Sequence, residues 1–326
     1  MGRVSWQRGD WASLRNHSPP RHEKCHYQLR SQSVSHERSE AGEGGRNVEH
    51  QPNRYRQPRR ASVVSTYFTD KSFIVTGASS GIGRAIAEAL AEGGARVAIM
   101  ARREELLSEV AGRFGDRVLS CPGDVTSKED CEAVVGEAVE SFGGLDGLIH
   151  NAGVTMRAVA IDTEMDVYRR LMEINFFSMV RLYQLSMPHL ARSNGHLVAV
   201  SSLMGRFSTQ LRSGYTASKH ALQGFMDSVR LEVTQDGVHV MVVSPGFVRT
   251  EGSVSALTAD GTLYGKMDAA MAAGLAPEAV AQEILTAIEK RKRDCFPTGP
   301  RERFGFWLSR HAPSALDRLL LRSEVK

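Results

Sequence analysis

The sequence predicts an α/β fold: a single doubly wound parallel sheet with helices on both faces. Short, strongly apolar runs alternate with amphipathic stretches from about residue 71 to residue 292. The first apolar run leads into TGASSGIG, a glycine-rich turn of the kind that joins a strand to a helix. The chain has 326 residues, 41% of them hydrophobic, which is enough to bury a substantial core. Alternating strands and helices of this kind form parallel sheets.

The first strand–helix pair illustrates the pattern that the rest of the chain repeats. KSFIVTG is a short apolar run that ends in glycine, and RAIAEALAEGG is an alanine-rich helix that two glycines stop. The strands are apolar throughout because helices would cover both of their faces, whereas the helices are amphipathic because only one face is covered. Strands are expected at residues 71–77, 95–101, 117–122, 145–153, 195–202 and 238–246. Helices are expected at residues 84–94, 103–114, 128–144, 165–192, around Tyr215, and at 276–292.

The N-terminal part differs in composition from the rest. Residues 1–66 are predicted to be a disordered basic tail, since Arg, Ser, His and Gln dominate and few aliphatic residues are available to form a core. Residues 1–60 carry 12 Lys+Arg and 6 Asp+Glu, a net charge of +6, so the remaining 29 basic and 31 acidic residues give −2. The tail could be a targeting or contact arm, a linker, or the product of a start site placed too early. Residues 67–326 form the expected folded domain, with a C-terminal extension at 298–326.

Composition argues against several classes of function. The folded part has no basic excess, so no nucleic-acid partner is expected. The cysteines contain no CxxC pair, which argues against a disulfide framework and a metal site. There is no apolar run of eighteen residues to span a membrane, and the first residues lack the apolar stretch of a secretory signal. A cytoplasmic protein is expected.

The turn TGASSGIG is predicted to hold the phosphates of a dinucleotide. Gly77 allows a tight turn, Gly81 lets the backbone approach a pyrophosphate, and Gly83 lets the helix pack closely on the strand. The start of the following helix offers free N–H groups and a partial positive charge. The candidate cofactor-binding residues here are Gly77, Ser79, Ser80, Gly81, Ile82 and Gly83.

The end of the second strand bears on the choice of cofactor. A carboxylate there would bind the ribose hydroxyls of NAD and repel a 2′-phosphate. This chain instead has Ala101 followed by Arg102 and Arg103, which could clamp that phosphate. NADP(H) is therefore expected in preference to NAD(H), the alternative being that both arginines only decorate a surface helix.

A second motif places Tyr215 and Lys219 one helical turn apart in SGYTASKHA, with Ser202 at the end of the preceding strand. Together with the glycine turn, this resembles the classical short-chain dehydrogenase/reductase family over about residues 71–297. The resemblance rests on TGASSGIG, GDV, NAG, YTASK and PGFVRT, in the order and spacing of the family. The stretch SVSALTADGTLYGKMD further resembles the group called dehydrogenase/reductase member seven-B.

The resemblance implies a Rossmann-like, NAD(P)-binding domain and a role for each matching residue. Asp124 and Val125 would flank the adenine. The cofactor cleft would be lined by Asn151, Ala152 and Gly153, and its nicotinamide end by Pro245, Gly246, Val248 and Thr250. The catalytic tetrad would be Asn175, Ser202, Tyr215 and Lys219, of which Tyr215 and Lys219 also contact the cofactor.

Two positions depart from the family pattern without replacing a catalytic group. His150 stands where asparagine is frequent, and Ser178 stands where glycine often follows the catalytic asparagine. Membrane-anchored relatives carry an apolar N-terminal segment, which residues 1–66 of this chain do not show. The membrane location of those relatives is therefore not expected here.

The expected chemistry is the interconversion of a carbonyl and a secondary alcohol. A tyrosine pKa of about 10 must fall by roughly three units, or about 4 kcal/mol, for proton transfer near neutrality. Lys219 shares a helix face with Tyr215, so its ammonium is expected to favour the phenolate. Ser202 would donate a hydrogen bond to the substrate oxygen. In the family, the asparagine at position 175 binds a water that completes a proton relay.

Residues 251–275 and the side chains of Val154, Met204 and Phe207 are expected to set specificity. Their apolar character suggests a lipid, a steroid or another hydrophobic ketone, or else simple packing of the segment. A 3-oxoacyl thioester reductase and a non-catalytic dinucleotide-binding protein are the alternative functions. The family implies a homodimer or homotetramer, and residues 298–326 could pack on the core, on another subunit or on a membrane surface.

Overall fold

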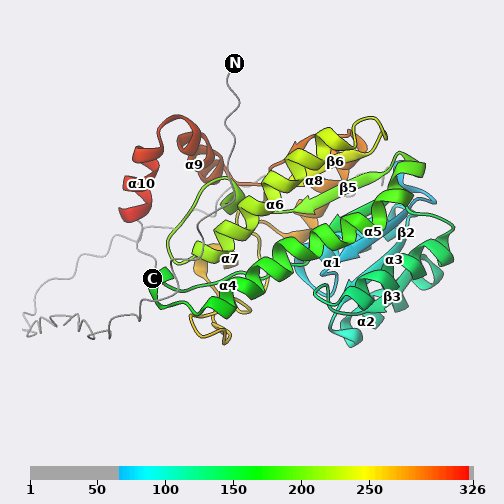
Figure 1. Cartoon of the computed structure of the whole chain (residues 1–326), viewed down its shortest axis with the longest axis horizontal. Coiled ribbons are helices and arrows are strands. Elements are labelled where there is room, and N and C mark those ends of the chain that lie inside the picture. The colour runs from blue at the N-terminus through cyan, green and yellow to red at the C-terminus, as the bar shows by residue number, and fades with distance from the viewer. Residues whose placement is uncertain (1–65, 323–326) are drawn as a thin grey trace, which may run out of the picture. The chain divides into compact units, whose positions relative to one another are not determined.

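The computed structural model describes residues 66–322 (Figure 1). The predicted tail at 1–66 lies outside the described residues, except for Thr66. Seven parallel strands form one sheet in the order β3-β2-β1-β4-β5-β6-β7, so the α/β prediction is confirmed. The strands are β1 Ser72–Thr76, β2 Arg96–Ala101, β3 Val118–Pro122, β4 Gly147–His150, β5 His196–Val200, β6 His239–Val243 and β7 Asp294–Cys295.

The helices follow the predicted order, with additions at the C-terminal end. They are α1 Gly81–Glu92, α2 Glu104–Phe114, α3 Lys128–Phe142, α4 Met165–Met172, α5 Ser178–Ser193, α6 Ser213–Glu232, α7 Ala269–Ala272, α8 Pro277–Glu289, α9 Pro300–His311 and α10 Pro313–Arg322. Short 3₁₀ turns occupy Thr66–Phe68, Gly115–Arg117, Ala160–Asp162 and Leu203–Gly205. Within residues 66–322, no helix combines the length and the apolar character needed to cross a bilayer.

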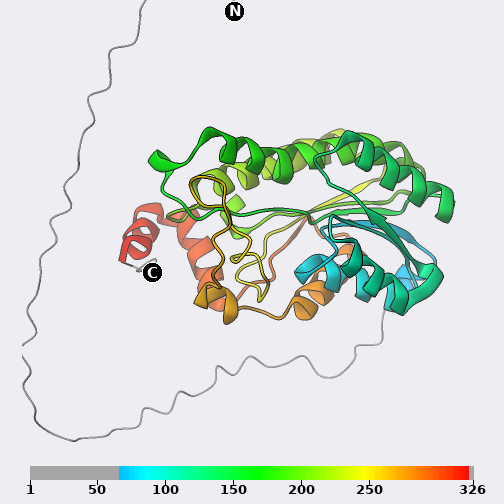
Figure 2. The same cartoon turned by 90° about the horizontal axis from the view of Figure 1, so that it is seen from below.

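The sheet lies between two layers of helices, as the edge-on view shows (Figure 2). Strand side chains alternate between the two faces, so Phe73 and Val75 of β1 join one buried cluster and Ile74 joins the other. The first cluster is closed by α1, α2 and α8, and the second by α3, α5 and α6. After β3 the chain crosses to the other side of β1, so the strand order reverses between β1 and β4. In such sheets ligands bind at this point, at the carboxyl ends of the strands.

The stretch predicted as one helix over 165–192 is interrupted in its middle. Residues Glu173–Phe177 form a π-turn between α4 and α5. Such single-turn bulges contain one extra residue and are frequent at functional sites. Hydrophobic periodicity did not reveal it, because a single inserted residue hardly changes the pattern on either side.

The C-terminal extension forms the helical hairpin α9–α10 beside the carboxyl ends of the strands. Phe306 of α9 stacks on Phe296 with ring centroids 5.2 Å apart, and Leu316 of α10 is buried. The Phe304 and Trp307 side chains of α9 remain more than half exposed, at 56% and 54%. The extension therefore packs on the domain along one side and leaves an aromatic face accessible.

A chain of buried imidazoles crosses the opposite, amino-terminal end of the sheet. His239 donates from Nε2 to the Lys292 carbonyl at 2.8 Å, so a neutral His239 accepts at Nδ1. His196 then donates from its Nδ1 across 2.9 Å, and its Nε2 accepts from the Tyr67 hydroxyl at 2.8 Å. Both imidazoles are held neutral, since burial lowers the pKa of His239 and lowers the pKa of His196 to about 3.

We expect stability to fall on mild acidification because these histidines, like the buried His150, resist protonation in the folded state. A lowered folded-state pKa stabilises the protein above the unfolded value of about 6.5, and the stabilisation is lost as the pH falls toward 3. For His196, linkage gives a loss of roughly 2 kcal/mol in the free energy of unfolding between pH 7 and pH 5. Urea unfolding at both pH values measures it. A His196→Gln variant should show a smaller loss, and an unfolding free energy unchanged between the two pH values in the natural sequence would contradict the expectation.

Candidate functional site

At the glycine positions of the turn TGASSGIG there is no room for a side chain. Gly77 and Gly81 have φ values of +66° and +58°, where residues with a Cβ are strained. A Cβ on Gly81 would come within 2.9 Å of Thr250 Cγ2, and one on Gly83 within 2.5 Å of the Gly77 carbonyl oxygen. Ser80 precedes α1 with no side-chain capping bond, so the first N–H groups of the helix are left for a ligand. These features fit a bound pyrophosphate.

The NAG motif after β4 ties this turn to the centre of the sheet. The Asn151 amide donates to the carbonyls of Thr76 and Gly77 at 3.1 and 3.3 Å. The Thr76 hydroxyl accepts from the backbone N–H groups of Asn151 and Ala152, both at 3.1 Å. Asn151 therefore holds the turn, and Gly153 lies so near the predicted tetrad that an added Cβ would be 3.1 Å from Asn175 Oδ1 and 3.4 Å from Lys219 Nζ. Thr76 belongs to this support but was not among the predicted site residues.

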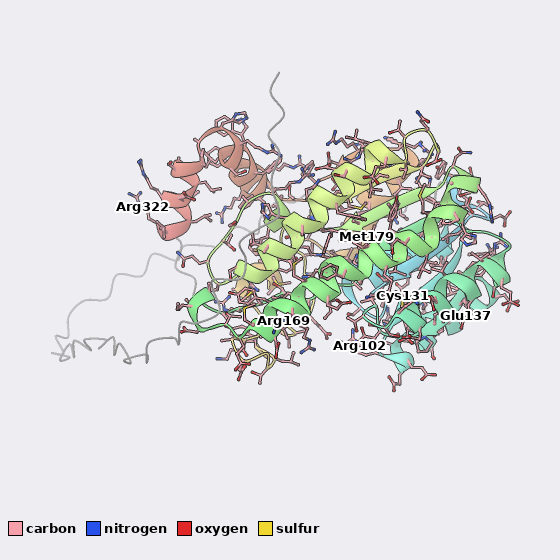
Figure 3. All side chains as sticks on the ribbon, in the orientation of Figure 1. Arg102, Cys131, Glu137, Arg169, Met179 and Arg322 are labelled. Atoms are coloured by element: carbon pink, nitrogen blue, oxygen red, sulfur yellow. The ribbon has the colours of Figure 1, made fainter. Side chains whose placement is uncertain are left out.

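The two arginines after β2 lie on either side of the same region. Arg103 donates to the Ser79 hydroxyl at 3.0 Å and to the Ser80 hydroxyl at 2.6 Å, which brings its guanidinium onto the glycine turn. Arg102 lies beside α2 and α3, and its guanidinium is 4.0 Å from the carboxylate of Asp124 (Figure 3). Both side chains are partly exposed and so accessible to a ligand.

Asp124 and Val125 sit at the end of β3, on the adenine side of the expected cleft. Asp124 Oδ1 accepts from the N–H and hydroxyl of Thr126 at 2.9 and 2.8 Å, so this oxygen stabilises the loop that follows β3. The Val125 carbonyl accepts from Arg181 of α5 at 3.0 Å. Arg181 also donates to Glu173 in the π-turn at 2.8 Å and thereby links the loop after β3 to the turn that holds Asn175.

The PGFVRT motif lies at the other end of the expected cleft. The buried Pro245 accepts at its carbonyl from the N–H of Leu203, which follows Ser202. Val248 is buried and pairs with Leu275, and Thr250 lies over Gly81. Gly246 is crowded by Glu302 of α9, whose Cγ would be 3.3 Å from an added Cβ. The motif thus meets both the glycine turn and the C-terminal hairpin.

Tyr215 and Ser202 meet at the carboxyl end of β5. The Ser202 hydroxyl accepts from the Met204 N–H at 3.1 Å, which leaves its proton free to donate elsewhere. Tyr215 packs against the apolar cluster that contains Met156 and Leu257 and is partly exposed. Burial raises the pKa of Tyr215, while the hydrogen bond with Ser202 and the positive charge of Arg212 oppose this rise. Arg212 is the cation acting on the phenol, so the expected lowering by Lys219 is not found among these side chains.

Lys219 lies beneath the tyrosine with its amine buried. Its Nζ is 5.9 Å from the centroid of the Tyr215 ring and donates to the Val200 carbonyl at 3.0 Å. Burial lowers the pKa of Lys219 to about 8. An amine with this pKa exchanges protons readily near neutral pH, which is what a proton relay to the phenol requires.

Asn175 occupies the π-turn and is fully buried. Its Oδ1 accepts from the Val154 N–H at 2.8 Å, and its Nδ2 donates to the Val154 carbonyl at 2.9 Å and to Ser218 Oγ at 2.8 Å. The amide thus fixes the loop after β4 against α6, and both of its N–H donors are used. The water-binding role that the family implies for Asn175 would need another atom of this residue, such as its backbone carbonyl oxygen.

The predicted specificity segment folds back over the loop after β4. Leu257 pairs with Met156, and Asp268 binds Arg157 at 3.0 Å and Arg212 at 2.9 Å. Arg212 therefore acts both on this segment and on Tyr215. Since 56 positions separate Arg212 from Asp268, the sequence offered no local signal for this contact.

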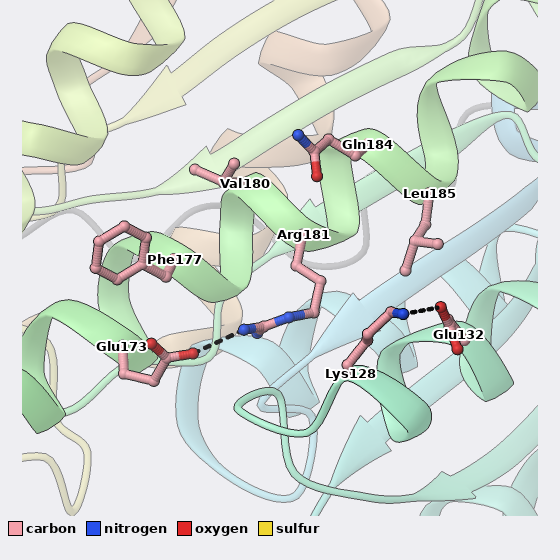
Figure 4. A pocket seen from close by; sticks show the side chains of 8 residues that line it. All are labelled: Lys128, Glu132, Glu173, Phe177, Val180, Arg181, Gln184 and Leu185. Carbon is pink, nitrogen blue, oxygen red and sulfur yellow. Dashed lines mark hydrogen bonds and ion pairs between the residues drawn. The ribbon is translucent and has the colours of Figure 1, made fainter.

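A surface pocket elsewhere contains none of the predicted site residues. It lies along the first turns of α5 and the start of α3, where two ion pairs, Lys128–Glu132 and Arg181–Glu173, cross its wall (Figure 4). The catalytic candidates instead gather at the strand ends, where polar groups converge. Within residues 66–322, no group of His, Cys, Asp or Glu side chains is arranged to hold a metal ion.

The short chain dehydrogenase family matches residues 71–260 of the chain. Dehydrogenase/reductase SDR family member 7B of Bos taurus is 39% identical over 269 residues, which cover 79% of this chain and 82% of that protein. Member 7B of Danio rerio is 40% identical over 240 residues, covering 71% and 78% of the two chains.

A solved structure shares the fold. It is a short-chain dehydrogenase/reductase of unknown function from Caenorhabditis elegans, determined with cofactor, with 26% identity and a TM-score of 0.63 over 71% of this chain and 95% of that one. The parallel sheet, the glycine turn and these relatives lead to one conclusion: the chain belongs to the short-chain dehydrogenase/reductase family of oxidoreductases.

Proposed function

We propose that the protein is an NADP(H)-dependent oxidoreductase that interconverts a carbonyl and a secondary alcohol on a hydrophobic substrate, with Tyr215 as the acid/base. The observation that carries this proposal is the hydrogen bond between the partly buried Tyr215 and the Ser202 hydroxyl, beside a buried amine whose pKa is about 8. The nicotinamide supplies or accepts the hydride. The protein side chains then have to orient the substrate oxygen and move one proton.

In the direction of reduction, Tyr215 donates its proton to the substrate oxygen. The Ser202 hydroxyl, which bonds to Tyr215 in this structure, would turn its proton to the same substrate oxygen and stabilise charge developing there. Lys219, one turn further along α6, would return a proton to the phenol, since its buried amine has a pKa of about 8 and lies 5.9 Å from the ring centroid. Arg212, anchored by Asp268, supplies the positive charge that favours the ionised phenol.

The preference for NADP(H) is supported by the charges around the end of β2. Arg103 already binds the hydroxyls of Ser79 and Ser80, and the same guanidinium and hydroxyls could share a phosphate. Arg102 is more exposed and lies on the other side. The last residue of β2 is Ala101, so the carboxylate that would select NAD is not at this position.

The hydrophobic character of the substrate is supported by the side chains around Tyr215. The phenol packs with Val154 and Ala259 against a small apolar cluster that includes Met156 and Leu257. A ligand reaching Tyr215 would therefore contact aliphatic side chains on the side of the 251–275 segment. Arg157 and Arg212 are both already paired with Asp268, which reduces their availability to an ionic substrate.

Absorbance of the nicotinamide, followed with a panel of ketones and the matching alcohols, tests the proposal. We expect turnover with apolar ketones and a kcat/KM for NADPH at least about tenfold above that for NADH, the effect of one charge-assisted contact. A preference for NADH would overturn the cofactor assignment. No turnover with any substrate by folded, cofactor-binding protein would favour a non-catalytic dinucleotide-binding function.

A further inference from the structure

The two residues that depart from the family pattern contact each other. His150 ends β4 and Ser178 begins α5, 28 positions later, yet His150 Nε2 and Ser178 Oγ are 2.7 Å apart. Both side chains are completely buried. The two departures from the family pattern are therefore the two partners of one hydrogen bond.

The direction of each hydrogen bond follows from the acceptors. Ser178 Oγ donates its only proton to the Ile174 carbonyl at 2.6 Å. The serine must then accept from His150, so the imidazole carries its proton on Nε2 and has a bare Nδ1. Among the described residues, this buried Nδ1 has no hydrogen-bond partner. Burial and the charge of Lys219 lower the pKa of His150 to about 3, which agrees with a neutral ring.

The serine hydroxyl acts on the π-turn itself. In the turn, the N–H of Ser178 bonds to the carbonyl of Glu173, five residues back, and not to that of Ile174 as in an α-helix. The Ile174 carbonyl thereby loses its usual partner. The Ser178 hydroxyl supplies a replacement, and His150 fixes the rotamer of that hydroxyl from the neighbouring strand.

We propose that His150 and Ser178 are a positioning pair that holds the π-turn open and so keeps the Asn175 amide in place. Asn175 lies inside the turn that the pair supports and is bound to both backbone groups of Val154. Its other contact, Ser218 Oγ, is itself bonded to the Tyr215 carbonyl at 2.8 Å. A change at the turn is thus passed to the helix that carries the phenol. The kinetic consequence rests on the proposed carbonyl–alcohol chemistry.

Ser178→Ala tests the pair with little change in volume. It leaves the His150 N–H and the Ile174 carbonyl unpaired, and we expect kcat to fall about tenfold while KM for NADPH changes less than about twofold. The matched control is Ser186→Ala on the same helix, because the Ser186 hydroxyl is buried with no partner among the described residues. That variant should keep the natural kcat. A kcat for Ser178→Ala within about twofold of the natural value overturns the proposal.

A double-mutant cycle tests whether the two residues act as a unit. The pair His150→Asn with Ser178→Gly introduces the residues common in the family. We expect the double variant to lose no more kcat than the worse single variant, whereas independent residues would multiply their losses. Multiplying losses would overturn the proposal.

A measurement without turnover separates this inference from the proposed function. In protein labelled with ¹⁵N-histidine, the His150 signal, identified by its loss in His150→Asn, should show a protonated Nε2 and a bare Nδ1 at neutral pH. In Ser178→Ala that signal should shift while the other histidines keep theirs. A proton on Nδ1 would overturn the inference even in an inactive enzyme, and the expected pattern in an inactive enzyme would leave only the proposed chemistry at fault.

Discussion

Tyr215→Phe is expected to lower kcat by at least about 100-fold, equivalent to about 2.7 kcal/mol of transition-state stabilisation. The variant keeps the ring that packs against the apolar cluster of Met156 and Leu257 but removes the hydroxyl that we propose exchanges a proton with the substrate. Because the glycine turn and the arginines that we propose bind NADPH lie on other segments, the affinity for NADPH should change less than about twofold. Single-turnover rates and fluorescence titration with NADPH measure the two quantities.

The control for this variant is Tyr183→Phe. Tyr183 is another partly buried tyrosine, on α5, and its ring packs edge-on against Phe225 with centroids 5.6 Å apart. It lies outside the predicted tetrad, so its replacement should leave kcat unchanged. Retained turnover in Tyr215→Phe, with the control behaving as expected, would falsify the proton-transfer role of Tyr215.

Arg103→Glu is expected to reverse the cofactor preference. The guanidinium at the glycine turn would be replaced by a carboxylate that repels a 2′-phosphate and binds ribose hydroxyls instead. We expect kcat/KM for NADPH to fall about 100-fold, the loss of a charge-assisted interaction plus repulsion, while kcat/KM for NADH stays equal or rises. Initial rates with both cofactors at a fixed ketone concentration measure the change.

Arg113→Glu is the matched control for the cofactor experiment. Arg113 lies on the same helix as the residues that follow Arg103, but its guanidinium pairs with Glu88 of α1. The same change in charge there should leave the ratio of the two cofactors unaltered. If both variants change the ratio equally, general charge and not a phosphate contact accounts for the preference, and the role of Arg103 is refuted.

Features that depend on neighbours in the sequence could be predicted. The six longer strands and the helices from α1 to α8, apart from the single-turn α7, follow from apolar runs, helical periodicity and glycine stops. The Tyr215–Lys219 spacing and the turn around Gly81 were recognisable because each motif is contiguous. That the two motifs lie at the same edge of the sheet could also be predicted, because a parallel sheet brings the carboxyl ends of its strands together.

Features that depend on distant contacts could not be predicted. Strand β7 has only two residues, too few to show a period. His150 and Ser178 are individually ordinary, and only the fold reveals that they are bonded. The link from Asp268 to Arg212 likewise joins a loop to the start of α6. Departures from a family pattern were the one signal that pointed to the first of these pairs.

A π-turn is equivalent to an α-helix into which one residue has been inserted. In-frame loss of a single codon within Glu173–Phe177 would restore an uninterrupted helix through α4 and α5. The glycine turn and the sheet are encoded elsewhere and would keep their sequences. One lost codon there is therefore expected to displace Asn175 and leave the architecture intact, so within this family the geometry around the π-turn is more easily erased than the sheet.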